Sequence, residues 1–591
     1  MSDKFQKLPD QEELERELSE YLSKKYGRPV RVISPMMMPS AKESKTKESG
    51  PRGLEKIQFD MKPEELEAYL DQYVVKQDQA KAILATKICT HYNRIKWQME
   101  HGRRAPDSAV GRIKNNIILM GPTGVGKTYL IKLIAQKLGV PFVKGDATKF
   151  SETGYVGGDV EDLVRDLVRA ADDDLELAQY GIIYIDEIDK IASASNLIGP
   201  DVSRTGVQRA LLKPMEETEV DLRVPHDPIS QLQAIEQYRK SGKREKQTIN
   251  TKNILFIVSG AFNGLAEKVK KRLHQQGLGF KASVQSRSDD FKYLQHVKAE
   301  DLIAYGFESE FVGRLPVIAV LEPLEVEDLY QILKNPNNPI IQGKKEDFRC
   351  YGIDLKFEDE ALRVLAEKAY QEKTGARGLV SVIERALLGF EKKLPSTSIR
   401  YLVVTREMVL EPEAELEKIL KDPDSPERRR IYERILREEK EAVREQVLRK
   451  KKHYVQNYPF VFTQSRLDLL VEQHLRTGEP LEDLFDEMIT LYNQVKVFED
   501  EFHERHGYRI HFDDQAVTAI VSRALRENKP AGSVCREISR DYDYGFKLVA
   551  ERSGQTQFIL PREAVEEPGS YLDNLIRETY RKYPLQERDE D

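Results

Sequence analysis

The chain has 591 residues, too many for one hydrophobic core, so we expect about three to five domains. Charged residues make up 33% of the chain, the net charge is −7, and no apolar run approaches the ~20 residues of a membrane helix. These values predict a soluble cytoplasmic protein with no membrane and no nucleic-acid partner. Cys89, Cys350 and Cys535 lie far apart and form no CxxC pair, so we expect neither zinc nor a disulfide framework.

The elements expected along the chain change character several times. Residues 1–55 begin with a short amphipathic pattern and continue as a polar linker, and 64–100 has helical periodicity. Between 115 and 320, apolar runs such as NIILM, GIIYID and NILFIVSG alternate with amphipathic helices. That alternation is typical of a parallel α/β sheet. Residues 325–412 are mostly helical, and 413–500 are helical and heavily charged.

The stretch GPTGVGKT has the pattern of a phosphate-binding loop, because it follows the apolar run NNIILM and precedes a helical pattern. Its glycines let backbone N–H groups turn toward phosphate oxygens, and the helix N-terminus adds its positive end. Lys127 is expected to reach the β- and γ-phosphates of ATP, and Thr128 to ligate Mg²⁺. The predicted nucleotide loop consists of Gly121, Pro122, Thr123, Gly124, Val125, Gly126, Lys127 and Thr128.

A second motif, GIIYIDEIDK at 181–190, is an apolar strand that ends in acidic residues. Asp186 at the strand tip is expected to hold Mg²⁺. Glu187 is expected to orient and deprotonate the attacking water. Taken with the upstream loop, this motif predicts ATP hydrolysis.

An internal repeat lies outside these motifs. YGIDLKFEDEALRVLAEKAY at 351–370 aligns with HGYRIHFDDQAVTAIVSRAL at 506–525, and TREMVLEP at 405–412 aligns with PREAVEEP at 561–568 with one residue inserted between. The pattern favours a duplicated small domain. Two unrelated helices of similar pattern are the alternative.

The motifs above, together with DATKFSETGYVGGDVEDLV, GVQRALLK, FESEFVGRLPV and KTGARGL in this order, resemble the ClpX family of AAA+ ATPases in the Clp/Hsp100 group. The resemblance covers roughly residues 60–412. It implies a homo-hexamer that binds ATP and Mg²⁺ between subunits. It also implies that unfolded or tagged proteins are threaded through a central pore.

The fold class that follows is α/β, with an AAA+ P-loop domain built on a parallel sheet and an α-helical small (lid) domain. A charged helical segment and a second lid-like C-terminal domain come after it. The expected domains are an N-terminal helix and linker at 1–55, the large ATPase domain at 56–322, the small lid domain at 323–412, the charged helical region at 413–500 and a degenerate second lid at 501–591.

The resemblance also implies roles for single residues of the nucleotide site. Arg314 in VGRLP is similar to the arginine finger that reaches a neighbour's γ-phosphate. Arg377 in GARG is similar to the second sensor, which ties the small domain to nucleotide. Tyr73, Val74 and Val75 resemble the segment that packs on adenine, although the family favours glycine where this chain has Lys76.

Polypeptide handling is implied by GYVG, whose Tyr155 and Val156 resemble the residues of a pore loop that grips substrate. An aromatic and an aliphatic side chain can hold any polypeptide by van der Waals contact. Without the resemblance, GYVG could equally be a turn with a packed tyrosine. Residues 199–208 resemble a second pore loop.

The chain departs from the family at several points. Residues 1–55 have no cysteine, so we expect no zinc-binding N-terminal domain. In place of a short basic pore-entrance loop, the basic patch at 239–246 could meet acidic substrates or could be a solvated charge run. Leu278, Gly279 and Phe280 resemble a docking loop, and two readings stay open: a ClpP-like peptidase partner, or an exposed loop tip.

The C-terminal third has a less defined role. The counterpart of Arg377 in the second half of the repeat falls near Gly532, which cannot contact phosphate, so we expect an interaction or scaffolding module there. Residues 413–500 could form a partner-binding arm or a spacer. The chain has no G-x-S-x-G motif and no H-E-x-x-H motif, so any proteolysis would need a separate partner.

Our main hypothesis is therefore an ATP-dependent protein unfoldase. The alternative is an ATP-dependent remodelling scaffold that acts on one dedicated partner without protease delivery. A nucleic-acid motor is a third reading, which the aromatic loop and the acidic net charge disfavour.

Overall fold

The computed structural model describes residues 57–101, 114–150, 158–193, 202–222, 248–276, 287–457, 461–540 and 542–583. Tyr155, Val156, Leu278, Gly279, Phe280, the linker at 1–55 and the basic patch at 239–246 lie outside these ranges. The chain divides into two compact units, one formed by residues up to 332 with 366–381, the other by 333–365 with 382 onward. None of the described helices combines the length and apolar character needed to cross a membrane.

The first unit is built on a five-stranded sheet in the order β2-β3-β6-β1-β7, in which every neighbouring pair is parallel. The strands are β1 (Ile117–Met120), β2 (Phe142–Asp146), β3 (Ile182–Asp186), β6 (Leu255–Gly260) and β7 (Val317–Val320). All residues of β1 and β6 are buried, as expected for parallel strands covered on both faces. This sheet confirms the predicted α/β fold class.

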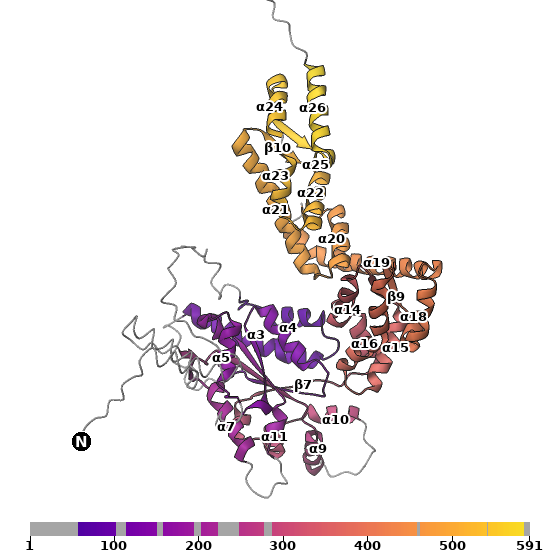
Figure 1. The fold of residues 1–591 in the computed structure, drawn as a ribbon. Coiled ribbons are helices and arrows are strands. Elements are labelled where there is room, and N and C mark those ends of the chain that lie inside the picture. The colour runs from indigo at the N-terminus through magenta and orange to yellow at the C-terminus, as the bar shows by residue number, and fades with distance from the viewer. Residues whose placement is uncertain are drawn as a thin grey trace, which may run out of the picture. The chain divides into compact units, whose positions relative to one another are not determined.

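Helices cover both faces of the sheet. On one face, Ile118 and Met120 join a core with apolar residues from α5, α7, α9, α11 and α12. On the other face, α3 packs against β7 and α4 against β3. Figure 1 shows α3 and α4 on one side of the strands and α9 and α11 on the other.

The helices and short strands of this unit are α2 (Pro63–Asp71), α3 (Asp78–His101), α4 (Lys127–Leu138), α5 (Asp162–Ala170), α6 (Leu175–Ala178), α7 (Val202–Met215), β4 (Glu219–Asp221), β5 (Thr248–Asn250), α9 (Leu265–Gln276), α10 (Arg287–Leu294), α11 (Ala299–Tyr305) and α12 (Ser309–Gly313). Three further helices, α13 (Val326–Lys334), α15 (Asp359–Gln371) and α16 (Ala376–Lys393), cross the division between the units.

The second unit contains both halves of the sequence repeat. Its other elements are α14 (Pro339–Arg349), β8 (Asp354–Phe357), β9 (Tyr401–Val404), α17 (Arg406–Leu410), α18 (Pro412–Lys421), α19 (Pro426–Asn457), α20 (Gln464–Thr477), α21 (Leu481–His506), β10 (Arg509–Phe512), α22 (Asp514–Glu527), α23 (Ala531–Ile538), α24 (Tyr542–Ser553), β11 (Gln557–Leu560), α25 (Arg562–Glu566) and α26 (Pro568–Lys582).

The two repeats follow the same plan. In residues 351–412, hereafter the first repeat, β8 pairs in parallel with β9; in residues 506–568, the second repeat, β10 pairs in parallel with β11. Each first strand is preceded by a glycine with positive φ, Gly352 at 73° and Gly507 at 76°. The one clear difference is that α16 is a single helix, whereas α23 and α24 are separate.

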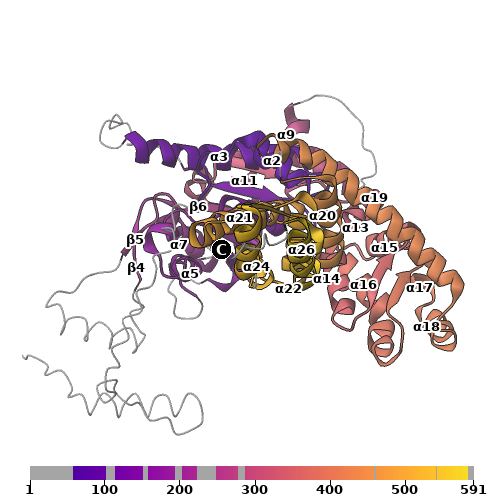
Figure 2. The same cartoon turned by 90° about the horizontal axis from the view of Figure 1, so that it is seen from above.

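The charged helix α19 is packed rather than free. It contacts β8 and β9 of the first repeat and α20 ahead of the second (Figure 2). Val443 and Val447 belong to the same hydrophobic core as Val461, Phe485 and other residues through to Leu572. The core of the C-terminal part therefore begins well before residue 501 and includes α20 and α21.

A buried charge cluster fixes α19 on the first repeat. Glu439 lies 2.6 Å from the Nζ of Lys356, whose side chain is 4% exposed, and 2.9 Å from the Nζ of Lys345. Burial alone would raise the pKa of Glu439, but the two ammonium groups hold it below the usual value. The charges of this cluster are thus paired, and removal of Glu439 would leave Lys356 buried without its main partner.

We therefore predict that Glu439→Ala destabilises the packing of α19 by about 3–5 kcal/mol, because removing one member of a buried pair strands the other charge. Hydrogen exchange of the α19 amides measures the effect. The double variant Glu439→Leu with Lys356→Met serves as the control and should recover most of the loss. Unchanged protection in Glu439→Ala would contradict the assignment.

Candidate functional site

The predicted phosphate loop lies between the carboxyl end of β1 and the start of α4. Gly124 and Gly126 have φ of 80° and 96°, a region that favours glycine. A Cβ on Gly124 would come within 2.1 Å of the carbonyl oxygen of Thr374, so no larger residue fits. Gly126 is also the N-cap of α4 and offers no side-chain acceptor, which leaves the first N–H groups of the helix for an anion.

Lys127 is held within this loop. Its Nζ donates hydrogen bonds to the carbonyl oxygens of Gly121 at 2.7 Å and Pro122 at 2.8 Å. Burial lowers the pKa of Lys127 to about 8, although the nearby carboxylates of Asp186 and Asp189 partly oppose the shift. The ammonium is therefore poorly solvated and suited to pair with phosphate.

Asp186 ends β3 beside the loop and is held by two partners. Its carboxylate accepts a hydrogen bond from the hydroxyl of Ser259 at 2.7 Å and lies 3.0 Å from the Nζ of Lys144. Burial alone would raise the pKa of Asp186, but these two groups hold it below the usual value. Asp186 is thus a fixed anion at the strand tip.

A chain of hydroxyl groups connects Asp186 to the phosphate loop. The Oγ1 of Thr128 donates to the hydroxyl of Tyr184 at 3.1 Å, and that hydroxyl lies 2.6 Å from the Oγ of Ser259, which donates to Asp186. Burial raises the pKa of Tyr184 to about 12, so it stays a neutral donor. The chain joins α4, β3 and β6 into one polar site.

Sequence reasoning missed three members of this site: Lys144, Tyr184 and Ser259. Tyr184 and Ser259 are polar side chains inside the otherwise apolar runs GIIYID and NILFIVSG, and Lys144 is a charged residue within the strand β2. A polar residue in a buried strand needs a partner, and that requirement is the signal that could have identified Tyr184 and Ser259. Lys144 is exposed and carries no such signal.

Glu187 follows Asp186 directly and has a positive φ of 58°. Its backbone N–H donates to Asp186 Oδ1 at 3.1 Å, and Glu187 itself is exposed. Asp189, two residues later, is buried, and its Oδ2 accepts from the N–H of Phe262 at 3.3 Å. The turn after β3 therefore presents one exposed carboxylate beside one fixed carboxylate.

The segment predicted to pack on adenine lies next to the phosphate loop. Tyr73 stacks obliquely on Tyr69, with ring centroids 4.9 Å apart, and Val74 is buried. Helix α2, which precedes the segment, packs against α4. Burial raises the pKa of Tyr129 in α4 to about 12, with Tyr73 close enough to contribute.

Lys76, the departure noted in the sequence, occupies a conformation that favours glycine, with φ of 62°. Its Nζ is held by Asp328 at 2.9 Å and by the carbonyl oxygen of Pro323 at 3.0 Å. The side chain of the adjacent Gln77 binds the backbone of Glu322. These contacts stabilise the strained turn that glycine would adopt freely.

Arg377 lies beside the loop as well. The N–H of Ala376 donates to the carbonyl oxygen of Gly124 at 2.9 Å, which fixes the start of α16 against the phosphate loop. Arg377 is close enough to Lys127 to contribute to the lowering of its pKa, as the last of the causes after burial. The structure thus brings Arg377 and Lys127 together.

Arg314 lies elsewhere in the same unit. Its carbonyl oxygen accepts from the side chain of Asn116, which precedes β1, and its guanidinium lies 2.5 Å from Glu216. Asn116 is at the amino end of β1 and the phosphate loop at the carboxyl end, about 13 Å apart for a four-residue strand. The structure does not bring Arg314 to the phosphate loop of its own chain.

The predicted loop that carries Tyr155 and Val156 lies outside the described residues, but the residues that flank it are described. Phe150 and Gly158 form a parallel β-bridge, and the N–H of Gly158 donates to the carbonyl oxygen of Lys149 at 3.0 Å. The two residues that flank this segment, Phe150 and Gly158, are therefore neighbours. Residues 202–208 of the second predicted loop lie in α7.

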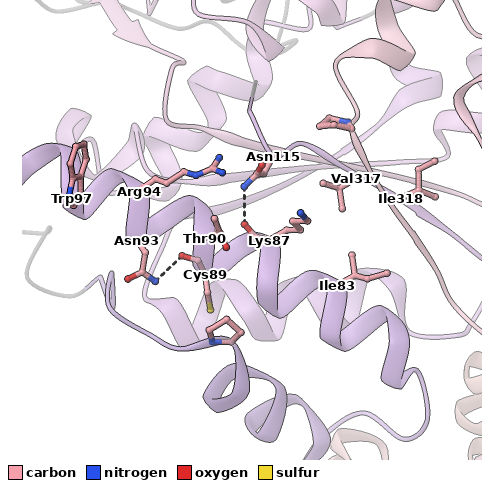
Figure 3. Close-up of a pocket in the computed structure, with 12 residues that line it drawn as sticks. Ile83, Lys87, Cys89, Thr90, Asn93, Arg94, Trp97, Asn115, Val317 and Ile318 are labelled. Carbon is pink, nitrogen blue, oxygen red and sulfur yellow. Dashed lines mark hydrogen bonds between the residues drawn. The ribbon is translucent and has the colours of Figure 1, made fainter. Parts of the chain in front are cut away.

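A groove of 1110 Å³ runs between α3 and the edge strand β7 (Figure 3). It is lined by residues that include Ile83, Lys87, Arg94, Trp97, Val317 and Ile318. Trp97 is 43% exposed. The groove contains none of the predicted site residues, so it is a feature separate from the phosphate loop.

The described residues contain no group of three or more His, Cys, Asp or Glu side chains that could hold a metal. One carboxylate, Asp186, and one hydroxyl, Thr128, fit Mg²⁺, which usually keeps several waters and binds substrate phosphates through few protein ligands. The glycine cradle and Lys127 likewise fit a polyphosphate. The site therefore fits a magnesium nucleotide better than a metal held by protein alone.

Comparison with known proteins gives the same assignment. Residues 112–318 match the model of the AAA domain (Cdc48 subfamily), and 324–389 match the C-terminal D2-small domain of ClpB protein. The ATP-dependent Clp protease ATP-binding subunit ClpX of Borrelia duttonii is 40% identical over 356 residues, 60% of this chain and 79% of the relative. The ClpX of Borrelia recurrentis gives the same values.

The ATP-dependent Clp protease ATP-binding subunit ClpX 3 of Methylococcus capsulatus is 39% identical over 359 residues, which are 59% of this chain and 80% of the relative. These matches, the parallel sheet and the phosphate loop agree with one another. The chain binds nucleotide and is an ATPase. It belongs to the ClpX family of AAA+ ATPases.

Proposed function

We propose that the protein forms a homo-hexameric ring in the cytoplasm, hydrolyses ATP with Mg²⁺ between subunits and unfolds proteins by threading them through a central pore. The observation that carries this proposal is the hydroxyl chain from Thr128 through Tyr184 and Ser259 to Asp186. It connects Thr128 of the phosphate loop to the strands β3 and β6, so the nucleotide site is anchored on two neighbouring strands of the sheet.

Within this site, Lys127 pairs with the β- and γ-phosphates, and Thr128 and Asp186 hold the magnesium ion. The bound metal neutralises charge on the phosphate oxygens. Ser259 and Lys144 hold Asp186 in place as the metal ligand, so the exposed neighbour Glu187 is the carboxylate available to take a proton from water. Tyr73, Val74 and Val75 pack on the base, and Arg377 approaches the phosphates.

Arg314 acts on the nucleotide of an adjacent subunit. Its place at the amino end of β1 supports this role, because the carboxyl end of that strand holds the phosphate loop of its own chain. An arginine supplied across an interface stabilises the charge of the transferring phosphoryl group. In the single chain, the guanidinium of Arg314 is paired with the carboxylate of Glu216.

The groove between α3 and β7 is a surface suited to contact between subunits. Trp97 and the strand β7, which is the edge of the sheet among the described strands, face the groove of Figure 3. An exposed tryptophan beside an open strand edge is suited to an interface. We propose that the adjacent subunit covers this groove.

Tyr155 and Val156 grip the polypeptide, and Leu278, Gly279 and Phe280 dock on a ClpP-like peptidase. The relatives named above are ATP-binding subunits of a Clp protease, which supports the second role. A remodelling scaffold with one dedicated partner is the second candidate function. It is favoured by the second repeat, in which Gly532 stands where the first has Arg377.

Tyr155→Ala should separate these two candidates. If the protein threads polypeptide, unfolding of a stable tagged substrate is lost while ATP hydrolysis continues, because the grip is lost but the site is intact. Glu187→Gln is the matched control and should stop both activities while ATP binding remains. Full function of Tyr155→Ala would exclude threading and leave the scaffold.

The pKa of Lys127 predicts how nucleotide affinity changes with pH. In the free protein its pKa is about 8, so the ammonium loses its charge as the pH rises through 8. Phosphate binding favours the charged form, so the Kd for ADP should be constant below about pH 7 and weaken toward tenfold per pH unit above 8. Calorimetric titration from pH 6.5 to 9.5 measures the slope.

Lys127→Arg is the control for that titration, because its guanidinium keeps its charge throughout this range. The variant should bind ADP more weakly at every pH but without the rise in Kd above pH 8. The same slope in Lys127→Arg and in the unaltered protein would show that another group titrates.

Assembly can be followed through Trp97, the one tryptophan of the chain. If the adjacent subunit covers the groove, formation of the ring should move the emission of Trp97 to shorter wavelength, because the half-exposed indole becomes buried. Sedimentation on the same samples establishes the assembled state. Ring formation without a change of emission would place the interface elsewhere.

A further inference from the structure

Each repeat has four side chains on one face of its two-stranded sheet, hereafter the outer face. In the first repeat Asp354 pairs with Tyr401 and Lys356 with Val403. In the second, Arg509 pairs with Gln557 and His511 with Ile559. The two sets occupy equivalent positions, because β8 aligns with β10 and β9 with β11 in the same register.

In the first repeat this outer face is covered. Helix α19 packs on both strands, and Lys356 and Val403 are only 3% and 7% exposed. The Tyr432 hydroxyl donates to Asp354 at 2.5 Å, and the rings of Tyr432 and Tyr401 lie 4.9 Å apart. Glu439 completes the contact through Lys356, as described above.

In the second repeat the equivalent face is open. Residues alternate strictly between exposed and buried along β10 and β11, whereas β8 and β9 are buried or half-buried throughout. Ile559 is 70% exposed at the position where Val403 is buried. Parallel strands are normally covered on both faces, so the open face is an incomplete layer.

The first repeat indicates what kind of element completes the layer: an amphipathic helix. The helix α19 of this chain cannot repeat its contacts on the second face, because the Tyr432 hydroxyl that donates to Asp354 would meet Arg509, which offers no acceptor. His511 already lies 3.2 Å from Glu499, so a further acid there is unfavourable. Arg509 has no ion-pair partner among the residues that the structure describes.

We propose that the outer face of β10 and β11 binds an amphipathic helix of a partner protein, with an apolar side chain over Ile559 and a carboxylate against Arg509. The helix lies across the two strands as α19 lies across β8 and β9. This contact gives the C-terminal part of the chain a dedicated partner, and it does not depend on the proposed unfolding activity.

A designed peptide tests the shape and the charge of this face. The probe is a fluorescent peptide of residues 426–445 with Tyr432→Glu, which places an acid against Arg509, and Glu439→Gln, which avoids repulsion from Glu499. Anisotropy with the full chain should show saturable binding. The natural 426–445 peptide is the control and should bind at least about tenfold more weakly, the effect of one missing charge pair.

Variants of the full chain locate the binding. Ile559→Asp and Arg509→Glu should each abolish binding of the probe, and a peptide with Tyr432→Lys should bind again to Arg509→Glu. Leu388→Asp alters a residue that is 64% exposed on α16 and should leave binding intact. ATP hydrolysis should be unchanged in all three variants, which separates this site from the nucleotide site.

Several outcomes would overturn the proposal. They are equal binding of both peptides, binding that survives Ile559→Asp, and failure of the charge-reversed peptide to rescue Arg509→Glu. A change in the sedimentation of Ile559→Asp alone would assign the face to a second copy of this chain. Binding that requires removal of residues 584–591 would assign it to the chain's own C-terminus.

Discussion

The hydroxyl chain from Thr128 to Asp186 holds the nucleotide site together. Thr128 donates to Tyr184, and Tyr184 and Ser259 each bond to both neighbours in the chain, so the position of one member constrains the next, and burial makes an unpaired member costly. The chain also fixes Asp186, the carboxylate that we propose for Mg²⁺, and Glu187 is exposed beside it. The phosphate loop, the proposed magnesium ligands and the proposed base therefore depend on the packing of α4 against β3 and on the register of β3 against β6.

The second unit contains the same small fold twice, but only the first copy has both faces of its sheet covered. The first repeat is covered by α19 through Tyr432 and Glu439, whereas the second repeat presents the same face to solvent. Asp354 and Lys356, which bind Tyr432 and Glu439 of α19, are replaced by Arg509 and His511 in the second repeat. This open face is where we propose that the C-terminal part of the chain binds its partner.

How much the sequence predicted depends on whether the determining interaction is local. The loop at 121–128 and the acids after GIIYID were located from sequence because glycine conformation and strand ends are local properties. Tyr184 and Ser259 were missed because their meeting depends on the register of β3 against β6. The packing of α19 on the first repeat was missed because charged residues surround its few apolar positions. The ion pair between Lys76 and Asp328 was missed because the two residues are distant in sequence.

The central claim is that a site built by one chain is completed by Arg314 of an adjacent subunit. The most direct measurement is the ATPase rate of mixed rings made from Lys127→Ala and Arg314→Ala proteins. Each variant alone should be inactive, whereas an equal mixture should recover about a quarter of the normal rate, because that share of interfaces joins an intact loop to an intact arginine. No recovery on mixing, or normal turnover by Arg314→Ala alone, would contradict the account.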